Sequence, residues 1–319
     1  MNMKKFSLSD SEITWDADAW LKRFNSKSAN YRSLRREVWE NTKLIVEANG
    51  YKLNQADAEA VLLRDFTSGN SRKSYFYNKA FAVSFEMLAN APEVTVVEYD
   101  CLDCAHDWMR QGLDACVLNM ANRRNPGGGV VNGAGAQEEY LFRCSDYYKF
   151  LYRYAHYAEQ YNLSRLSEQY PLDKNFGGIY SQGVMIFREN EETGYRLAEQ
   201  PWQVNMITVA GMNSPALVIE NGRKLIAPEL VEGVKNKIRT IFRIACEHHQ
   251  RNLVLGALGC GAFRNPPEHV AELFKAVLCE REFKGAFSKI CFAVKRNHNS
   301  HGDRNYLAFK KILNGFKPE

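Results

Sequence analysis

Residues 115–139 read ACVLNMANRRNPGGGVVNGAGAQEE, and this stretch has the pattern of a strand, a glycine-rich loop and the start of a helix. It begins with a short apolar run, residues 115–121, which is typical of a strand buried on both faces. A loop with three consecutive glycines follows, and then two adjacent carboxylates that predict the first turn of a helix. In open α/β folds ligands bind beyond the carboxyl ends of such strands, so this loop is a candidate binding site.

The rest of the chain repeats this alternation of short apolar runs and helical patterns. Apolar residues follow a helical period in residues 231–245 and 270–278, and Leu141, Cys144, Tyr148 and Leu151 form the predicted buried face of another helix. These patterns predict a three-layer α/β/α sandwich with a mixed sheet. The predicted strands are residues 94–98, 115–121, 184–187, 204–210, 253–258 and 289–294.

The first part of the chain has a different pattern. Residues 30–48 predict a helix that ends at Gly50, and it belongs to an N-terminal helical extension of residues 1–74 ahead of a domain of residues 75–319. Three basic residues on this helix, Arg32, Arg35 and Arg36, are interpreted as part of a solvated face. Residues 161–180 are polar and are interpreted as a surface excursion.

The composition is that of a folded protein with a mild positive charge. Hydrophobic residues make up 45% of the chain and charged residues 25%, and the net charge is +5. This charge is too small and too scattered to predict direct nucleic-acid binding. No apolar run of about 18 residues predicts a membrane span. The N-terminus lacks the apolar core of a secretory signal, so we expect a cytoplasmic protein without a membrane partner.

The eight cysteines lie mostly inside apolar patterns. Cys101 and Cys104 have the spacing of a zinc pair, but no second pair follows at suitable spacing. We therefore expect neither a metal nor a cofactor.

A second glycine-rich loop follows the apolar run 253–255. Gly259 and Gly261 lie ahead of a predicted helix, where unpaired backbone N–H groups suit a diphosphate. The loop lacks the Gly-Lys-Ser/Thr of a Walker loop and the Gly-x-Gly-x-x-Gly of dinucleotide-binding folds. It predicts a diphosphate ligand of another kind.

Glu138 and Glu139 have two interpretations. Acidic residues are favoured in the first turn of a helix by its dipole, so the pair could be purely structural. Their position after a glycine-rich loop favours a catalytic role instead.

Taken together, the two loops resemble those of the microbial branch of poly(ADP-ribose) glycohydrolases, within the macrodomain superfamily. The family signature is three glycines, six to eight residues, and then Gln-Glu-Glu; here the spacer is the seven residues 130–136. The strand end at residues 118–122 resembles the macrodomain strand that delivers an asparagine to a ribose. The resemblance extends from about Ser74 to the end of the chain.

The resemblance implies a role for each matched residue. Glu139 would be the catalytic acid, and Glu138 would help to hold the leaving-group ribose. The distal ribose would contact Asn122 and Phe263. Leu258 stands where relatives often carry an aromatic residue. The implied substrate-binding residues are Asn119, Asn122, Gly127, Gly128, Gly129, Gln137, Gly259, Cys260, Gly261, Ala262 and Phe263.

The implied activity is hydrolysis of the ribose–ribose O-glycosidic bonds of poly(ADP-ribose), with Glu139 as general acid and base and ADP-ribose as product. This role requires Glu139 to hold a proton near neutral pH while substrate is bound. The expected partners are poly(ADP-ribose) or an ADP-ribosylated protein. Two alternatives remain open at this point: a mono-ADP-ribosyl hydrolase, and a non-catalytic macrodomain that binds ADP-ribose.

Overall fold

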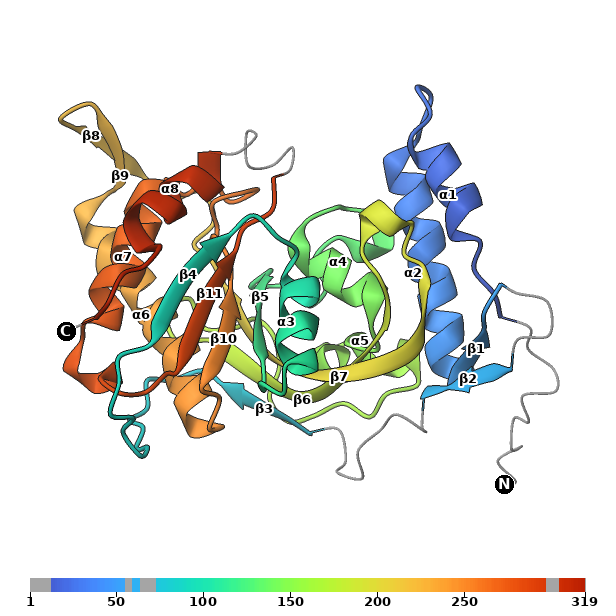
Figure 1. Cartoon of the computed structure of the whole chain (residues 1–319), viewed down its shortest axis with the longest axis horizontal. Helices are drawn as coiled ribbons and strands as arrows, with labels where there is room; N and C mark the ends of the chain where they lie inside the picture. The colour runs from blue at the N-terminus through green and yellow to red at the C-terminus, as the bar shows by residue number, and fades with distance from the viewer. Residues whose placement is uncertain (1–12, 55–58, 64–72, 297–303, 319) are drawn as a thin grey trace.

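The computed structural model describes residues 13–54, 59–63, 73–296 and 304–318, and it is built on a seven-stranded sheet (Figure 1). The strands are β3 (Lys73–Tyr77), β4 (Glu93–Val97), β5 (Cys116–Ala121), β6 (Gly178–Arg188), β7 (Leu197–Ala210), β10 (Asn252–Leu255) and β11 (Lys289–Ala293). Their order across the sheet is β3-β6-β7-β5-β10-β11-β4. β5 is parallel to β7 and β10, whereas β6 is antiparallel to β7, so the predicted mixed sheet is confirmed.

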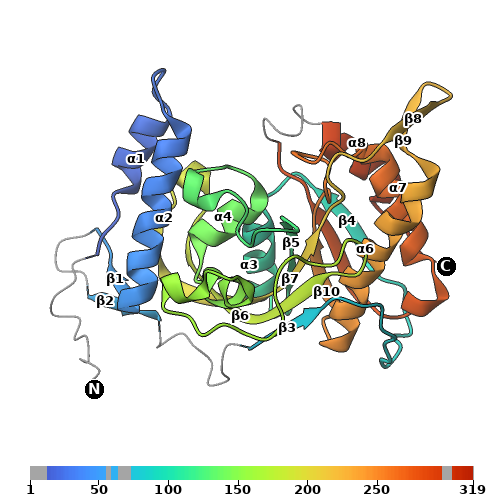
Figure 2. The same cartoon turned by 180° about the vertical axis from the view of Figure 1, so that it is seen from behind.

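Alternate residues of the strands face two apolar cores, one on each side of the sheet. Val117 of β5 packs into the same core as Phe142, whereas Cys116 and Leu118 belong to the core on the other side. Burial on both faces explains why the strands read as continuous apolar runs. Helices cover both cores, which confirms the predicted three layers (Figure 2). The first core is covered by α3 (Cys101–Arg110), α4 (Gln137–Cys144) and α5 (Tyr148–Leu151), and the second by α6 (Pro228–Glu247), α7 (Pro267–Leu278) and α8 (Arg304–Leu313).

Short elements make up several of the connections. A hairpin of β8 (Leu217–Glu220) and β9 (Arg223–Ile226) lies between β7 and α6. The single turns of 3₁₀ helix are η3 (Val130–Asn132), η4 (Tyr152–Tyr154), η5 (Ala158–Tyr161), η6 (Glu191–Thr193) and η7 (Arg281–Phe283).

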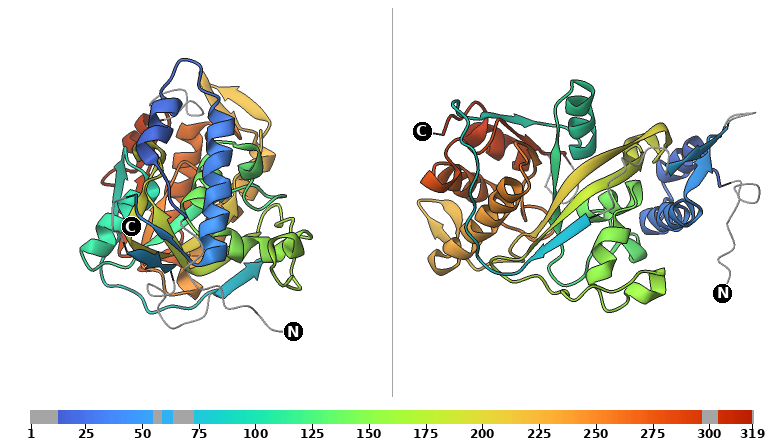
Figure 3. Two further views of the ribbon diagram at one scale, coloured as in Figure 1. Left: turned by 90° about the vertical axis from the view of Figure 1, so that its right-hand side faces the viewer. Right: turned by 90° about the horizontal axis from the view of Figure 1, so that it is seen from below.

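The N-terminal residues form α1 (Ala17–Phe24), α2 (Tyr31–Ala48) and a small sheet of β1 (Gly50–Lys52) and β2 (Ala60–Leu62). They lie at the end of the molecule opposite α7 and α8 (Figure 3). Trp39 of α2 is fully buried, with its ring 5.5 Å from that of Tyr148. The hydroxyl of Thr42 donates a 2.6 Å hydrogen bond to the carbonyl of Arg143. The predicted domain boundary after residue 74 falls within β3 and stays a prediction.

The predicted helix 30–48 is confirmed, but its stop at Gly50 was wrong. The residue that ends α2 in the left-handed conformation is Asn49, with a φ of 56°. Asparagine tolerates this conformation better than other side chains do. Gly50 already belongs to β1, where it pairs with Leu62.

The central strands β6 and β7 are longer than predicted. Their pairing extends from Gly178 to Arg188, and its register shifts between Ser181 and Val184. Gly183 lies within this shift at a φ of +73°, and such a bulge interrupts the apolar pattern that marks a strand in sequence. Residues 161–180 are accordingly not only a surface excursion, because Leu172 is fully buried and β6 begins at Gly178.

The helix predicted to bury Leu141 and Leu151 on one face is divided into α4 and α5. Between them, the hydroxyl of Ser145 donates back to the carbonyl of Leu141, and a carboxylate oxygen of Asp146 accepts the N–H of Met185. The first bond closes the end of α4, and the second ties the break to β6. Within the described ranges, no helix combines the length and apolarity needed to cross a membrane.

Candidate active site

Three loops meet at the edge of the sheet where β5, β7 and β10 end. Both neighbours of β5 run parallel to it, so their carboxyl ends lie together. The loops after β7 and β10 touch, since a Cβ on Gly211 would lie 2.8 Å from the Cα of Gly259. The loops after β5 and β10 were predicted from sequence. The loop after β7 was not, although Gly211 directly follows a predicted strand and was the available signal.

Glu138 lies in the first turn of α4 and is tied to the loop that precedes it. Its Oε1 accepts the N–H of Gly127 at 3.0 Å, and its Oε2 accepts the N–H of Asn122 at 2.7 Å. The residue is only 3% exposed. This carboxyl therefore joins the two ends of the segment 122–127 to the helix, which a solvated helix start would not do.

The position of Glu138 raises its pKa to about 8. Burial is the larger cause, and the charge of Glu139 is the second. The hydrogen bonds from Asn122, Gly127 and Asn119 oppose the rise but do not cancel it.

Glu139 is held by one oxygen only. Its Oε1 accepts the N–H of Gly129 at 2.8 Å. Its Oε2 is buried, and no described residue forms a hydrogen bond with it. A buried carboxyl oxygen without a partner is costly, so it is available to exchange a proton or a hydrogen bond with a ligand.

Gly128 lies against both carboxyls. A Cβ at this position would lie 2.4 Å from Oε1 of Glu139 and 3.3 Å from Oε2 of Glu138. The φ of Gly128 is +53°, a conformation that other residues rarely adopt. Glycine is therefore required here for a steric reason and for a conformational one.

Backbone N–H groups of the three glycines are already used within the protein. Gly127 and Gly129 donate to the two carboxyls, and Gly128 donates to the carbonyl of Asn125 at 3.0 Å. The sequence reasoning expected these glycines to line a diphosphate and a ribose. In the structure Gly127 is buried, Gly128 and Gly129 are half-buried, and none of the three has an unused N–H donor among the described residues.

The side chains of Asn119 and Gln137 both contact other parts of the protein. Asn119 is fully buried, with its Nδ2 3.4 Å from Oε1 of Glu138 and its Oδ1 without a hydrogen-bond partner among the described residues. The side-chain amide of Gln137 donates to the carbonyl of Leu118 at 2.7 Å and accepts the N–H of Met120 at 2.9 Å. Gln137 thus fastens the start of α4 to β5, and its predicted contact with substrate stays a prediction.

Asn122 combines a loop-forming role with partial exposure. Its Oδ1 accepts the N–H groups of Arg124 at 2.9 Å and Asn125 at 3.1 Å, which shapes the turn after β5. The residue is half-buried, and the predicted contact of its side chain with a ribose stays a prediction.

The loop after β10 offers the donors that the first loop lacks. Among the described residues, none accepts a hydrogen bond from the backbone N–H of Gly261, Ala262 or Phe263. Three successive unused N–H groups can bind an anion such as a diphosphate. Cys260 is buried, whereas Ala262 is exposed and Phe263 half-buried at the loop surface.

Asn265, which sequence reasoning missed, holds this second loop in place. Its Nδ2 lies 2.6 Å from the carbonyl of Met212, 2.9 Å from that of Gly259 and 3.1 Å from that of Phe263. The residue is 3% exposed. One amide therefore joins the loop after β7 to the loop after β10. The asparagine before two prolines was visible in sequence, but its partners were not.

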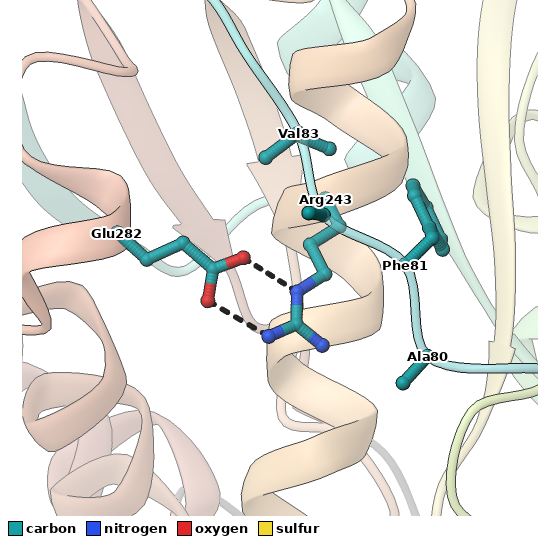
Figure 4. A pocket seen from close by; sticks show the side chains of 6 residues that line it. Ala80, Phe81, Val83, Arg243 and Glu282 are labelled. Atoms are coloured by element: carbon teal, nitrogen blue, oxygen red, sulfur yellow. Dashed lines mark hydrogen bonds and ion pairs between the residues drawn. The ribbon is translucent and has the colours of Figure 1, made fainter.

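Two surface pockets lie elsewhere in the molecule. One is formed by residues 80–83 against α6, where Arg243 forms a bidentate ion pair with Glu282 at 2.5 and 2.8 Å (Figure 4). The other includes Tyr77, Glu168 and Glu247. None of the described residues that line them belongs to the glycine-rich loops. In the first, the two charged side chains neutralise each other.

The described residues contain no group of three or more His, Cys, Asp or Glu side chains arranged to hold a metal ion. Cys101 and Cys104 both lie in α3, and their sulfur atoms have different contacts. Cys101 accepts a 3.6 Å contact from Gln137, and the sulfur of Cys104 lies 3.7 Å from that of Cys291.

Comparison with known proteins gives a consistent result. Residues 40–189 match the family model described as microbial-type PARG, catalytic domain, where PARG denotes poly(ADP-ribose) glycohydrolase. The PARG of Thermomonospora curvata is similar in structure, with a TM-score of 0.68, 26% identity, and coverage of 88% of this chain and 100% of that chain. A structure of the same enzyme bound to the inhibitor ADP-HPD is similar, with a TM-score of 0.64, 27% identity, and coverage of 88% and 99%. No curated protein matches the sequence.

The PARG of Deinococcus radiodurans in complex with ADP-ribose is 32% identical, with a TM-score of 0.54 and coverage of 71% of this chain and 86% of that chain. The likeness includes the macrodomain-like sheet between helices. With this identity over most of that chain and with a matching family model, the chain belongs to the family of microbial-type poly(ADP-ribose) glycohydrolases, which are glycosidase-type hydrolases.

Proposed function

We propose that this protein hydrolyses the ribose–ribose O-glycosidic bonds of poly(ADP-ribose) and releases ADP-ribose, with Glu139 as general acid and base. Family membership supports the activity on ADP-ribose polymers. The observation that carries the role of Glu139 is its uneven environment. One oxygen accepts a hydrogen bond from Gly129, and the other is buried without a partner among the described residues.

The proposed mechanism needs a single carboxyl in two protonation states. Protonated Glu139 gives its proton to the 2′-oxygen of the leaving ADP-ribose while the bond from this oxygen to the anomeric carbon breaks. The resulting oxocarbenium-like sugar is stabilised by the diphosphate of the substrate. Carboxylate Glu139 then takes a proton from a water molecule, whose oxygen bonds to the anomeric carbon. The carboxyl regains its proton, and the net reaction consumes one water.

Glu138 supports this chemistry by fixing the loop. Its two oxygens accept the N–H groups of Asn122 and Gly127, so it holds the segment that ends next to Glu139. Because its pKa is about 8, Glu138 retains a proton at neutral pH more often than an ordinary glutamate. This state limits the repulsion between the two adjacent carboxyls. A contact of Glu138 with the leaving-group ribose stays a prediction.

The two loops supply different parts of the proposed substrate site. The unused N–H groups of Gly261, Ala262 and Phe263 suit the diphosphate, and Gly259 and Cys260 form the turn that presents them. The half-buried backbone of Gly128 and Gly129 and the side chain of Asn122 suit the distal ribose, which Phe263 would cover. A contact of the buried Gly127 with the ligand stays a prediction.

The decisive experiment replaces Glu139 by glutamine, which keeps the shape of the side chain but removes the acid. We expect Glu139→Gln to lower kcat for polymer hydrolysis by at least about 100-fold, the contribution typical of a general acid or base. ADP-ribose binding measured by calorimetry should persist. The matched control is Glu86→Gln, an exposed carboxyl outside the site. Near-normal hydrolysis by Glu139→Gln would contradict the proposed mechanism.

The same assay separates the alternatives. Wild-type protein is incubated with the polymer and, in parallel, with mono-ADP-ribosylated protein, and free ADP-ribose is measured. Release from the mono-modified protein alone would identify a mono-ADP-ribosyl hydrolase. Binding of ADP-ribose without release from either substrate would identify a non-catalytic reader.

A further inference from the structure

We propose that Arg35, on the N-terminal helix α2, is a positioning residue for the loop that carries Glu139. This inference rests on the proposed function, because it assigns the residue to that active site. It gives Arg35 of the N-terminal helix a role in holding the loop that leads to Glu139.

Helix α2 packs directly on the loop between η3 and α4. A Cβ on Gly133 would lie 1.9 Å from the carbonyl oxygen of Arg32, and a Cβ on Gly135 would lie 2.3 Å from Nη1 of Arg35. Glycines at both positions therefore allow the helix and the loop to approach. This loop continues into Gln137, Glu138 and Glu139 within a few residues.

Arg35 does not extend into solvent, contrary to the predicted solvated face. Its guanidinium forms a bidentate pair with Glu191 of η6, at 2.7 Å from Nε to Oε2 and 2.8 Å from Nη2 to Oε1. The side chains of Arg35 and Glu191 are only 18% and 25% exposed. Two bonds to one carboxylate fix the plane of the guanidinium next to Gly135.

The pair continues into a second contact with the same loop. Oε2 of Glu191 also accepts the hydroxyl of Tyr195 at 2.9 Å, and this hydroxyl accepts Nε of Arg143 at 2.8 Å. Nη1 of Arg143 then donates to the carbonyl of Ala134 at 2.7 Å. Arg35 and Arg143 thus hold residues 134 and 135 from two sides, and Glu191 and Tyr195 join the two arginines.

The charges around this network favour its ionised form. The hydrogen bond to Glu191 is the main cause that raises the pKa of Arg35, and the charge of Glu139 adds to it. Burial opposes ionisation of Glu191, but the hydrogen bond and charge of Arg35 still lower its pKa. The contribution of Glu139 means that the guanidinium lies within electrostatic reach of the proposed catalytic carboxyl.

The loop that is held in this way leads directly into α4 and so sets the position of Glu139. Residues 129–136 are fixed at one end by the bond from Gly129 to Glu139 and near the other end by the two arginines. A misplacement of about 1 Å at a catalytic group can cost about 100-fold in rate. Loss of the arginine contact should therefore affect kcat more than binding.

The test compares Arg35→Gln with Arg36→Gln, its exposed neighbour on the same helix. Measured quantities are kcat and KM for polymer hydrolysis, the Kd for ADP-ribose, and thermal unfolding. The assays are run well below the unfolding temperature of each variant. We expect Arg35→Gln to lower kcat by about 10- to 100-fold and to change the Kd for ADP-ribose less. We expect Arg36→Gln to match wild type. Equal kcat in the two variants would overturn the proposal.

Two further variants keep the test decisive if Arg35→Gln folds poorly. Arg35→Lys retains the charge but cannot form the bidentate pair, so we expect an intermediate kcat. Glu191→Gln breaks the same pair from the other side. In a double-mutant cycle the losses from Arg35→Lys and Glu191→Gln should not add, because both remove one contact. Additive losses would contradict the network.

Failure of the proposed function is recognised separately. If the wild-type protein releases no ADP-ribose, the glycohydrolase assignment fails, whatever the variants do. The positioning is then judged by hydrogen exchange of the amides in residues 129–136. Faster exchange in Arg35→Gln than in Arg36→Gln would support the contact, and equal exchange would overturn it.

Discussion

The two glycine-rich loops of the active-site edge are fixed in opposite ways. In the loop after β5, the N–H groups of Gly127 and Gly129 are bound by two carboxyls, and the far end is held by arginines. In the loop after β10, a single neutral amide, Asn265, binds three carbonyls. The first loop has its donors occupied and its carbonyl of Ala134 bound, whereas the second has its carbonyls bound and three donors unused.

This difference predicts that the two loops respond differently to pH. The first loop is bound by Glu138, whose pKa is raised to about 8, so we expect the stability of this loop to depend on pH. The second loop is held by a group that does not titrate, so its anion-binding donors keep their geometry across the pH range. Three variants test this difference between the two loops, and the one expected to have the strongest effect comes first.

Gly128→Ala should disable the first loop. The new Cβ would lie 2.4 Å from Oε1 of Glu139, at a φ of +53°. Because the carboxyl must shift, we expect kcat for polymer hydrolysis to fall by about 100-fold. The control is Gly112→Ala, which has a φ of +78° but nothing within 4 Å of the new Cβ. The control carries the same kind of backbone strain, so equal kcat values would show that contact with Glu139 is irrelevant.

Glu138→Gln should flatten the pH dependence of stability. The pKa of Glu138 is about 8 in the folded protein, above its ordinary value of 4.5. The folded state therefore binds more protons than the unfolded state between these values. The contribution of Glu138 to the free energy of unfolding is therefore fully present below its ordinary pKa of 4.5. It is lost as the pH rises through the folded-state pKa of about 8.

Since one pKa unit corresponds to about 1.4 kcal/mol, this contribution amounts to a few kcal/mol across the window. Denaturant unfolding at several pH values measures it for wild type and Glu138→Gln. We compare the slope of the unfolding free energy with pH, because the variant also loses one backbone hydrogen bond at every pH: the NH2 group of glutamine cannot accept an N–H. An unchanged slope would rule out the raised pKa.

Asn265→Ala should loosen the second loop without pH dependence. The variant leaves the carbonyls of Met212, Gly259 and Phe263 without this donor, so we expect a loss of about 2 kcal/mol in the free energy of unfolding. The Kd for ADP-ribose should rise as the unused N–H groups lose their fixed geometry. The loss should be the same at both ends of the pH range, in contrast to Glu138→Gln. A loss of stability that varies with pH would contradict the claim that the second loop is held independently of pH.

Much of the fold could be predicted because its signals are local. The strands near residues 94, 116 and 289 have continuous apolar runs, and the helix 30–48 has one apolar face. β6 was underestimated because Gly183 interrupts its pattern at a bulge. β3 was missed as a strand: it is an edge strand of five residues, and none of them is buried.

The candidate site divides in the same way. The glycines and the pair Glu138–Glu139 could be predicted, because their order and spacing along the chain are themselves the signal. Asn265 could not be predicted, because an asparagine in a loop has the same local sequence whether it faces water or three carbonyls. Arg35 was misinterpreted for a related reason, since its partner Glu191 lies 156 residues away.

By itself, the sequence determined the alternation of strands and helices, the two glycine-rich loops and the family, because these depend on residues that are neighbours in the chain. Tertiary structure alone decided which oxygen of Glu139 is bound and which is unpartnered, which loop has unused donors, and that an N-terminal arginine reaches the catalytic loop. The reason is physical: a hydrogen bond or an ion pair depends on distances in space, and these are set by the strand order of the folded sheet.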